Sequence, residues 1–328
     1  MTTQPGAGIV GVGAYVPQRV VTNDDLSKIV DTSDEWIYSR TGIRERRFAR
    51  DDEYTSDMAL AAAKLALSRA EIKPSEVDYF IVATASPDNT FPNTACWVQK
   101  GLGCEGAACI DISTACSGFV YGLQQGAALV NSGESQICVV IGAEKLSAIT
   151  NFKDRGSCIL FADGAGAVVL RRSQDKGRIV CSRMGSAFDF DALAVPAGGC
   201  RMPASHQTVD ENAHKIAMKG RATYQTAVRK FAEMAMEACK RGNIAPEQLS
   251  WVVPHQANEH IIVSAMERAN VPKEKIVMNL ERYGNTSSAS IPIALDEAVS
   301  DGRIQRGQYV LLMGFGGGLS WGYNLIKW

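Results

Sequence analysis

The chain has 328 residues, of which 46% are hydrophobic and 21% charged, and its formal net charge is −1 at pH 7. This composition is typical of globular domains and excludes a disordered, collagen-like or coiled-coil chain. The balanced charge provides no overall field for nucleic acid or an anionic membrane, so we expect neither as a partner.

The first eight residues and the cysteines indicate the cellular compartment. Residues 1–8 are polar and lack a basic segment followed by an apolar one, so we expect no signal peptide. The apolar runs are strand-sized, too short to cross a membrane. The nine cysteines form no C-x-x-C pair, which is typical of reduced thiols without a zinc site. We therefore expect a cytoplasmic protein without a metal.

Helices and apolar strands alternate along the chain. Apolar spacing predicts an amphipathic helix over residues 56–70, with Ser56 as its N-cap. Strands are predicted after it at residues 79–84, 109–112 and 137–142, and a mostly apolar helix is predicted at residues 116–131. Nearly continuous apolar strands between helices are covered on both faces, so we expect parallel-type sheets in an α/β fold.

The chain contains an internal duplication. Residues 69–82 align with residues 241–254, with Arg, Ile and Pro at identical places and an offset of 172. The same offset sets Cys116 on Ser288, and each opens an apolar helical run. Repeats at a fixed offset indicate two similar structural units. We expect a five-layered α-β-α-β-α pseudo-dimer whose halves comprise residues 1–174 and 175–328.

Three further segments have structural interpretations. Residues 8–14 and 162–170 are glycine-rich, but neither runs into a helix as a dinucleotide-binding loop would, so we predict strands and turns there. Residues 188–212 are rich in turn-forming types and are predicted to form a long excursion over the surface.

Cys116 is the first candidate for chemistry. It lies between a predicted strand and an apolar helix, in the segment DISTACSGF. The positive end of a helix dipole lowers the pKa of a thiol, which would favour a nucleophile. The alternative from position alone is a small buried apolar residue.

His255, Asn285 and a closing glycine-rich segment are the other candidates. His255 follows the apolar run of residues 251–254, and α/β sheets gather active-site residues at such strand ends. Asn285 precedes a helix close to the position equivalent to Cys116. The alternatives are a structural histidine and a turn asparagine. The glycines of residues 314–322 allow the backbone to approach a reacting atom and aim N–H groups at it.

These motifs resemble one known family. Cys116 in TACSGF, His255 in PHQAN, Asn285 in YGNTSSAS and the closing GFGGGLSWG together resemble the β-ketoacyl-acyl-carrier-protein synthase III family of the thiolase superfamily. The motifs occur in the family's order from end to end. The resemblance implies a thiolase-like duplicated fold, a homodimer, and a transferase that initiates type II fatty acid biosynthesis.

The resemblance also implies a mechanism. Cys116 would accept an acyl group from an acyl-CoA primer such as acetyl-CoA, with the N–H groups of Cys116 and Gly317 as the oxyanion hole. His255 and Asn285 would bind the thioester carbonyl of malonyl-acyl-carrier protein while CO₂ leaves. The products are a β-ketoacyl-acyl-carrier protein and CoA, and no metal or redox cofactor is required.

Further positions carry over from the family one by one. Coenzyme A contacts are implied for Thr32, Trp36, Arg40, Arg155, Gly220 and Asn258. Phe91 matches the residue that closes the primer pocket across the dimer. Carrier-protein docking is implied for Lys219, Arg221, Gln256 and His260.

The chain departs from the family pattern in two places. Glu259 and His260 stand where the family usually has an apolar residue and an arginine, which weakens the expected docking of an acidic carrier. Residues 188–206 also differ from the common pattern, so the sequence does not indicate which acyl group serves as the primer.

Three alternatives compete with this interpretation. One is a related acyltransferase of secondary metabolism that uses Cys116 on another acceptor. Another is hydroxymethylglutaryl-CoA synthase, but Ala85 stands where its general acid/base glutamate is expected. A catalytically inactive scaffold is the third, and the joint presence of Cys116, His255 and Asn285 argues against it.

Overall fold

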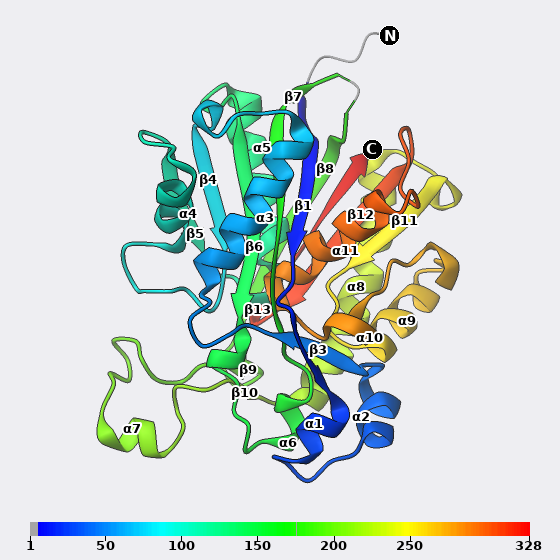
Figure 1. The fold of residues 1–328 in the computed structure, drawn as a ribbon. Coiled ribbons are helices and arrows are strands. Elements are labelled where there is room, and N and C mark those ends of the chain that lie inside the picture. The colour runs from blue at the N-terminus through cyan, green and yellow to red at the C-terminus, as the bar shows by residue number, and fades with distance from the viewer. Residues whose placement is uncertain (1–5, 175) are drawn as a thin grey trace.

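A long mixed sheet runs through the molecule (Figure 1). The computed structural model describes residues 6–174 and 176–328, with the side chains of residues 221 and 222 also left undescribed. Hydrogen bonding links nine strands in the order β11-β12-β13-β8-β1-β7-β6-β4-β5. Their bounds in chain order are β1 Gly6–Tyr15, β4 Tyr79–Ala83, β5 Ala108–Ile112, β6 Cys138–Lys145, β7 Asp163–Ser173, β8 Arg178–Asp189, β11 Leu249–Pro254, β12 Tyr309–Gly316 and β13 Gly318–Lys327.

This sheet consists of two half-sheets built in the same way. β1 and β8 pair only through Gly8 and Arg178, so the junction is narrow. The strand order β5-β4-β6-β7-β1 has its counterpart in β11-β12-β13-β8. The second half replaces a counterpart of β5 by an isolated parallel bridge between Val252 and Ile276. The predicted duplication is therefore visible in the topology, and it supports our proposal that the chain divides at residue 174.

Helices cover both half-sheets and also lie between them. The large helices are α3 Thr55–Ala70, α4 Thr94–Leu102, α5 Gly118–Ser132, α8 Gly220–Gly242, α9 Glu259–Arg268 and α11 Ser290–Ser300. α3 and α4 share one core with the first half-sheet, and α8 and α9 share another with the second. Phe119 and Leu123 of α5 pack with Ile291 and Leu295 of α11 in a core that includes strands of both halves. The five-layered α-β-α-β-α fold is thus confirmed.

Close contact between β1 and α3 shows how small residues set the layers. A Cβ on Gly11 would lie 2.3 Å from the carbonyl oxygen of Ala66, so only glycine fits there. The helix begins at Thr55 rather than Ser56, and its N-cap is Tyr54. The Asp57 carboxylate accepts a hydrogen bond of 2.9 Å from the Tyr54 N–H, and the prediction of Ser56 as N-cap is wrong.

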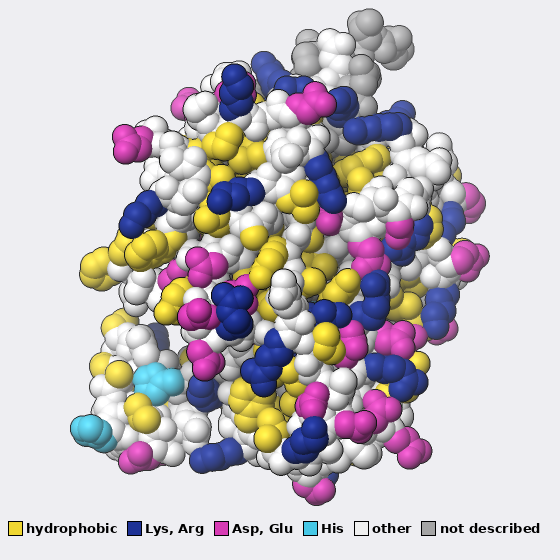
Figure 2. Space-filling model, in the orientation of Figure 1, with side chains coloured by type: hydrophobic (Ala, Val, Ile, Leu, Met, Phe, Trp, Pro, Cys, Tyr) yellow, Lys and Arg dark blue, Asp and Glu magenta, His cyan; other side chains and the backbone are white. Residues whose placement is uncertain are grey.

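Short elements gather below one end of the sheet, at the bottom of Figure 1. They are β2 Arg19–Thr22, α1 Asn23–Ser27, α2 Asp34–Thr41, β3 Glu45–Phe48, α6 Arg155–Cys158, β9 Leu193–Ala194, α7 His206–Asp210, β10 Ala217–Met218 and α10 Leu280–Tyr283. The predicted surface excursion lies here and contains α7, and Phe188 at its start is 92% exposed. Charges of both signs are interspersed over the face in Figure 2. In the described part of the chain, no helix combines the length and apolarity needed to cross a membrane.

Candidate active site

Cys116 lies in a tight turn between β5 and α5. The turn is the 3-10 helix η2 (Ala115–Ser117), and Ala115 has φ +45°, in the left-handed region. Gly118 opens α5, where a Cβ would approach that of Ala83 to 2.9 Å. The strand, strained turn and helix together place Cys116 at a helix N-terminus, with only 5% of the residue exposed.

The resting thiol is protonated. Burial raises the pKa of Cys116 to about 12, and a hydrogen bond from the Ser287 side chain only partly offsets this. Removal from water penalises the charged thiolate relative to the neutral thiol. The pKa of this thiol is thus raised in the unliganded site, opposite to the direction expected from the helix N-terminus alone.

The glycine-rich segment passes directly over the nucleophile. A Cβ on Gly316 would lie 2.6 Å from the Cys116 backbone nitrogen, and one on Gly314 would lie 2.9 Å from the Ser117 Cα. Side chains are excluded at both positions, which explains the glycines that end β12. Gly317, the next residue, lines a cavity together with Cys116.

His255 is a buried, neutral imidazole at the end of β11. Its Nδ1 lies 2.7 Å from the Ser290 hydroxyl, which itself donates to the Ser287 carbonyl at 2.8 Å. Because this hydroxyl has one hydrogen, Nδ1–H must donate to it, and Nε2 carries the lone pair. Burial lowers the pKa of His255 to about 3, so the ring is uncharged at neutral pH.

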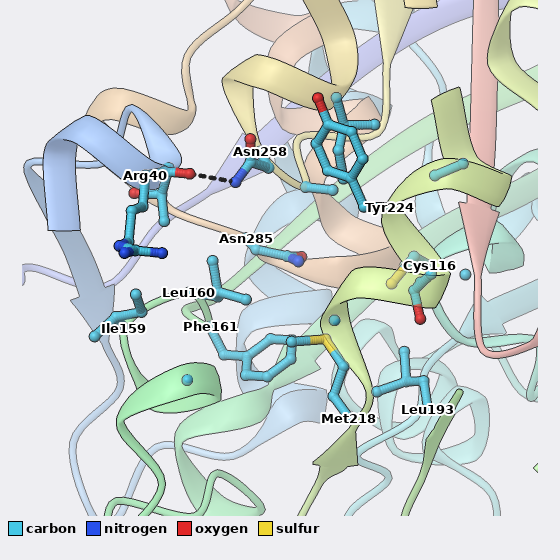
Figure 3. A pocket seen from close by; sticks show the side chains of 18 of the residues that line it. Arg40, Cys116, Ile159, Leu160, Phe161, Leu193, Met218, Tyr224, Asn258 and Asn285 are labelled. Carbon is cyan, nitrogen blue, oxygen red and sulfur yellow. Dashed lines mark hydrogen bonds between the residues drawn. The ribbon is translucent and has the colours of Figure 1, made fainter. Parts of the chain in front are cut away.

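Asn285 is held by its backbone and oriented by its side-chain oxygen. Its N–H donates to the Leu160 carbonyl and its carbonyl accepts from the Ala162 N–H, each at 2.9 Å. Its Oδ1 accepts from the Ser287 N–H at 2.9 Å, which leaves the Nδ2 hydrogens to donate elsewhere. Figure 3 shows the amide pointing toward the side of the pocket where Cys116 lies.

A pocket of about 640 Å³ brings these residues together. Cys116, His255 and Asn285 all line it, although they are far apart in the sequence. Its lining also includes five of the predicted coenzyme A contacts, Trp36, Arg40, Arg155, Gly220 and Asn258. The structure thus joins the predicted catalytic residues to most of the predicted coenzyme contacts.

The outer part of this pocket combines an aromatic ring with two cations. The guanidinium groups of Arg40 and Arg155 lie 4.7 and 4.8 Å from the centroid of the Trp36 ring. Asn258 donates to the Arg40 carbonyl at 2.8 Å, the bond drawn in Figure 3. Thr32 is different: it does not line the pocket, and its buried hydroxyl has no hydrogen-bond partner in the described structure. The coenzyme contact implied for Thr32 stays a prediction.

A second cavity of about 260 Å³ begins at Cys116. Cys116, Phe161 and Leu193 line both this cavity and the larger pocket. The rest of its lining is largely apolar, with Leu146, Ile149, Val195 and Ile216. Cys116 therefore lies where the larger pocket, which has Trp36, Arg40 and Arg155 in its outer part, meets the smaller, largely apolar cavity. Phe91 lines neither cavity and is 83% exposed.

The predicted docking residues divide into exposed and buried ones. Lys219 is exposed and pairs with Asp191 at 2.8 Å, and the exposed His260 contacts the Ser39 carbonyl through Nε2 at 2.9 Å. Gln256 is only 1% exposed and donates to the Pro254 carbonyl, so the assignment of Gln256 to a docking surface is wrong. The side chain of Arg221 lies outside the described residues.

Two residues beside the site escaped the sequence analysis. The Ser290 hydroxyl contacts His255 Nδ1, and Ser290 occurs in the same YGNTSSAS run as Asn285, so proximity in sequence was the available signal. Glu144 is a buried acid whose side chain reaches Ser288, and its position at the end of an apolar strand was the signal. Among the described residues, His, Cys, Asp and Glu side chains form no group of three or more that could hold a metal ion.

Fold and site together define a class: the protein is a thiolase-like condensing enzyme. Two segments match one family, described as 3-oxoacyl-[acyl-carrier-protein (ACP)] synthase III, over residues 110–187, and as its C-terminal part, over residues 239–328.

Full-length relatives extend this match to the whole chain. The chain is 47% identical to a β-ketoacyl-[acyl-carrier-protein] synthase III of Caldanaerobacter subterraneus, over 100% of the chain and 99% of the relative. A crystal structure of the 3-oxoacyl-[acyl-carrier-protein] synthase III of Aquifex aeolicus is similar with a TM-score of 0.91 at 46% identity, covering 98% and 100% of the two chains. The priming β-ketosynthase of the R1128 polyketide pathway gives a TM-score of 0.90 at 33% identity, covering 99% and 97%. The chain belongs to the β-ketoacyl-acyl-carrier-protein synthase III family.

Proposed function

We propose that this enzyme condenses an acyl-CoA primer with malonyl-acyl-carrier protein and so initiates type II fatty acid synthesis. The observation that carries the proposal is the single pocket that joins Cys116, His255 and Asn285 to the Trp36–Arg155 mouth. Its products are a β-ketoacyl-acyl-carrier protein, CoA and CO₂. The reaction consumes one proton and needs no metal or redox cofactor.

In the first half-reaction Cys116 takes the acyl group. Its sulfur attacks the thioester carbon, the bond from that carbon to the CoA sulfur breaks, and the thiol proton finishes on CoA. The backbone N–H groups of Cys116 and Gly317 are proposed to hold the transient oxyanion. The adenine would stack at Trp36 and Arg155, a role that their flat cationic and aromatic faces suit. The acyl chain would enter the apolar cavity beyond Cys116.

In the second half-reaction His255 and Asn285 hold the malonyl thioester carbonyl. Loss of CO₂ leaves an enolate, whose oxygen accepts from the Asn285 amide and from His255 Nε2. Nε2 donates in the ring tautomer whose Nδ1 accepts from the Ser290 hydroxyl, and the two tautomers exchange through water, which gives a proton to Nε2 and takes up the proton of Nδ1, so the ring gains no net proton. The enolate carbon attacks the acyl-cysteine, the thioester bond breaks, and the Cys116 thiolate takes a proton from water. Both donors are neutral, so they need not titrate.

Partners follow from the same proposal. The exposed Phe91 suits a residue that closes the primer pocket of a second copy in a homodimer. Lys219 and His260 are exposed near the pocket, where an acidic carrier protein would dock. The nine free cysteines accord with a cytoplasmic location.

The test is a panel of acyl-CoA primers incubated with malonyl-acyl-carrier protein. We expect acylation of Cys116 by mass spectrometry, release of CO₂, and a β-keto product. An acyl-enzyme that passes its acyl group to another acceptor, with no malonyl consumption, would instead indicate the secondary-metabolism acyltransferase. A protein that forms no acyl-enzyme with any primer would contradict the proposal.

A further inference from the structure

Glu144 is a buried acid that the proposed mechanism does not use. It lies near the end of β6 and is 0% exposed. Its Oε2 accepts from the Ser86 hydroxyl at 2.7 Å and from the Ala85 N–H at 3.0 Å. Its Oε1 lies 2.9 Å from the hydroxyl of Ser288. One carboxyl group therefore connects the segment after β4 to the segment that follows Asn285.

The hydrogens of this network can be counted. The Ser288 hydroxyl lies 2.8 Å from the Ala83 carbonyl oxygen as well as 2.9 Å from Glu144 Oε1. A carbonyl can only accept, so the single Ser288 hydrogen goes to Ala83. The short contact between Ser288 and Glu144 then needs a hydrogen on Oε1. The geometry fits a protonated carboxylic acid that donates to Ser288 and accepts on Oε2 from the Ala85 N–H, the Ser86 hydroxyl and, at 3.3 Å, the Thr84 hydroxyl. The Ser287 side chain is a further hydrogen-bond partner of the carboxyl group.

Among the described residues, no cation lies close enough to Glu144 to offset a negative charge. The neighbouring Lys145 turns its ammonium to the backbone carbonyls of Arg50 and Glu53, at 2.8 and 2.7 Å. A buried carboxyl without a partner charge stays neutral rather than ionised. Burial accordingly raises the pKa of Glu144.

Neutrality matters because the nucleophile is close. A negative charge on Glu144 raises the pKa of Cys116 and so opposes formation of the thiolate. A neutral acid keeps the hydrogen bonds without that penalty. The bonds hold Ala85, which lines the apolar cavity, and Ser288, which lies in η6 (Ser287–Ala289) directly after the Asn285 loop.

We propose that Glu144 is a neutral positioning residue that fixes the primer-side wall and the Asn285 loop around Cys116. This inference rests on the proposed function for its catalytic consequence. Glu144 itself does not contact the reacting atoms in the proposal; it acts through Ala85 and Ser288.

The decisive variant is Glu144→Gln. The amide NH₂ can donate to Ser288 and the amide oxygen can accept from Ala85 and Ser86, so we expect condensation within about threefold of the wild type and an unchanged pH profile. Glu144→Leu lacks these groups, and we expect a marked loss of condensation at saturating acyl-CoA. If Glu144→Gln falls to the level of Glu144→Leu, the neutral-acid proposal is overturned.

Asp163 provides a matched control, since it is also a buried carboxyl group but each of its hydrogen-bond partners in the described part of the chain is a donor. It faces donors only, the N–H groups of Ala49 and Ser147 and the Ser147 hydroxyl, at 2.8, 2.8 and 2.6 Å. An amide there must turn its NH₂ toward one of these N–H groups. Asp163→Asn should therefore lower the midpoint of thermal unfolding clearly more than Glu144→Gln does. Equal losses in the two variants would contradict the count.

Infrared spectroscopy tests the protonation state without relying on folding or activity. The difference spectrum between wild type and Glu144→Gln at neutral pH should contain the carbonyl stretch of a protonated acid. Bands of a carboxylate in its place would overturn the proposal even if every variant were active. Failure of the wild type to condense would count against the proposed function alone, because the spectrum would still report on Glu144.

Discussion

The two halves of the chain contain the same turn, but only one of the two turns carries the nucleophile. Ala115 and Ser287 occupy equivalent positions, with φ +45° and +48°, and each precedes a helix of the middle layer. The next residues are Cys116 and Ser288. Cys116 faces two cavities, whereas Ser288 is 0% exposed and bonded to Ala83 and Glu144. The duplicated fold thus contains a strained turn before a helix in each half. Only the turn at Cys116 borders the two cavities, so only this turn can present a nucleophile to a substrate.

Burial has opposite effects on the titrating groups of the two halves. It raises the pKa of the Cys116 thiol and lowers that of His255 to about 3. Both groups are consequently neutral at rest. The N-terminal half therefore contributes a protonated nucleophile, and the C-terminal half contributes neutral hydrogen-bonding groups for an enolate.

The largest expected effect on activity comes from removing the nucleophile of the N-terminal half, Cys116. Cys116→Ala should reduce acyl transfer by about 10⁴-fold or more, because the acyl group loses its only attachment point in the mechanism. Mass spectrometry after incubation with acyl-CoA measures the acyl-enzyme directly. Cys200→Ala is the control, since Cys200 is exposed and lies in neither cavity, and it should acylate normally. A Cys116→Ala protein that still forms the acyl-enzyme would refute the assignment.

The next effect separates the half-reactions. His255→Ala and Asn285→Ala each remove a donor proposed for the enolate, and loss of one such donor typically costs about 10²–10³ in rate. Both variants should still acylate Cys116 but condense poorly. Rapid-quench measurement of each half-reaction provides the test. Equal losses in acylation and condensation would show that the division of labour between the halves is wrong.

The neutral state of His255 predicts a dependence of stability on pH. The unfolded chain binds a proton near the ordinary histidine pKa of 6.5, which the folded chain refuses until about pH 3. Stability should therefore fall as pH falls through this window, by about 1.4 kcal/mol per pH unit from this side chain. Between about pH 6 and pH 4, urea unfolding of His255→Gln should lose about 2 kcal/mol less than the wild type. Parallel curves for the two proteins would mean that His255 is not held neutral.

Sequence patterns could predict the layers and the central residues but not their electrostatics. The offset of 172 and the alternation of apolar runs identified the duplicated fold, since both reflect burial along a regular backbone. The motifs around Cys116 and Asn285 located the site. The raised thiol pKa could not be predicted, because it depends on desolvation by distant segments such as Gly316. The burial of Gln256 was missed because its partners, Pro254 and Val277, are backbone carbonyls.

The smallest expected effect concerns α4 and α9, two helices that pack on the first and the second half-sheet. Both begin with an asparagine N-cap, Asn93 and Asn258, but only α9 continues with residues at the pocket mouth. Glu259 pairs with Lys273 at 3.2 Å and packs against Gly42, where a Cβ would meet its Oε2 at 2.5 Å. Its charge is therefore partly offset, and it repels an acidic carrier less than a free glutamate would.

The double change Glu259→Gln with His260→Arg sharpens this last difference. It keeps the packing on Gly42, frees Lys273 and adds a permanent cation, so kcat/KM for malonyl-acyl-carrier protein should rise about two- to fivefold at low salt, as expected for exposed charges worth up to ~1 kcal/mol. The gain should shrink as salt rises, because exposed charges are screened. Acylation by acyl-CoA should change less, since that ligand is proposed to bind at Trp36 and Arg155. As a control, Arg306→Gln removes a cation that lies over the ring of Trp328 and does not line the active-site pocket, so both rates should be unchanged. An equal gain in both half-reactions, or none at low salt, would place carrier docking away from α9.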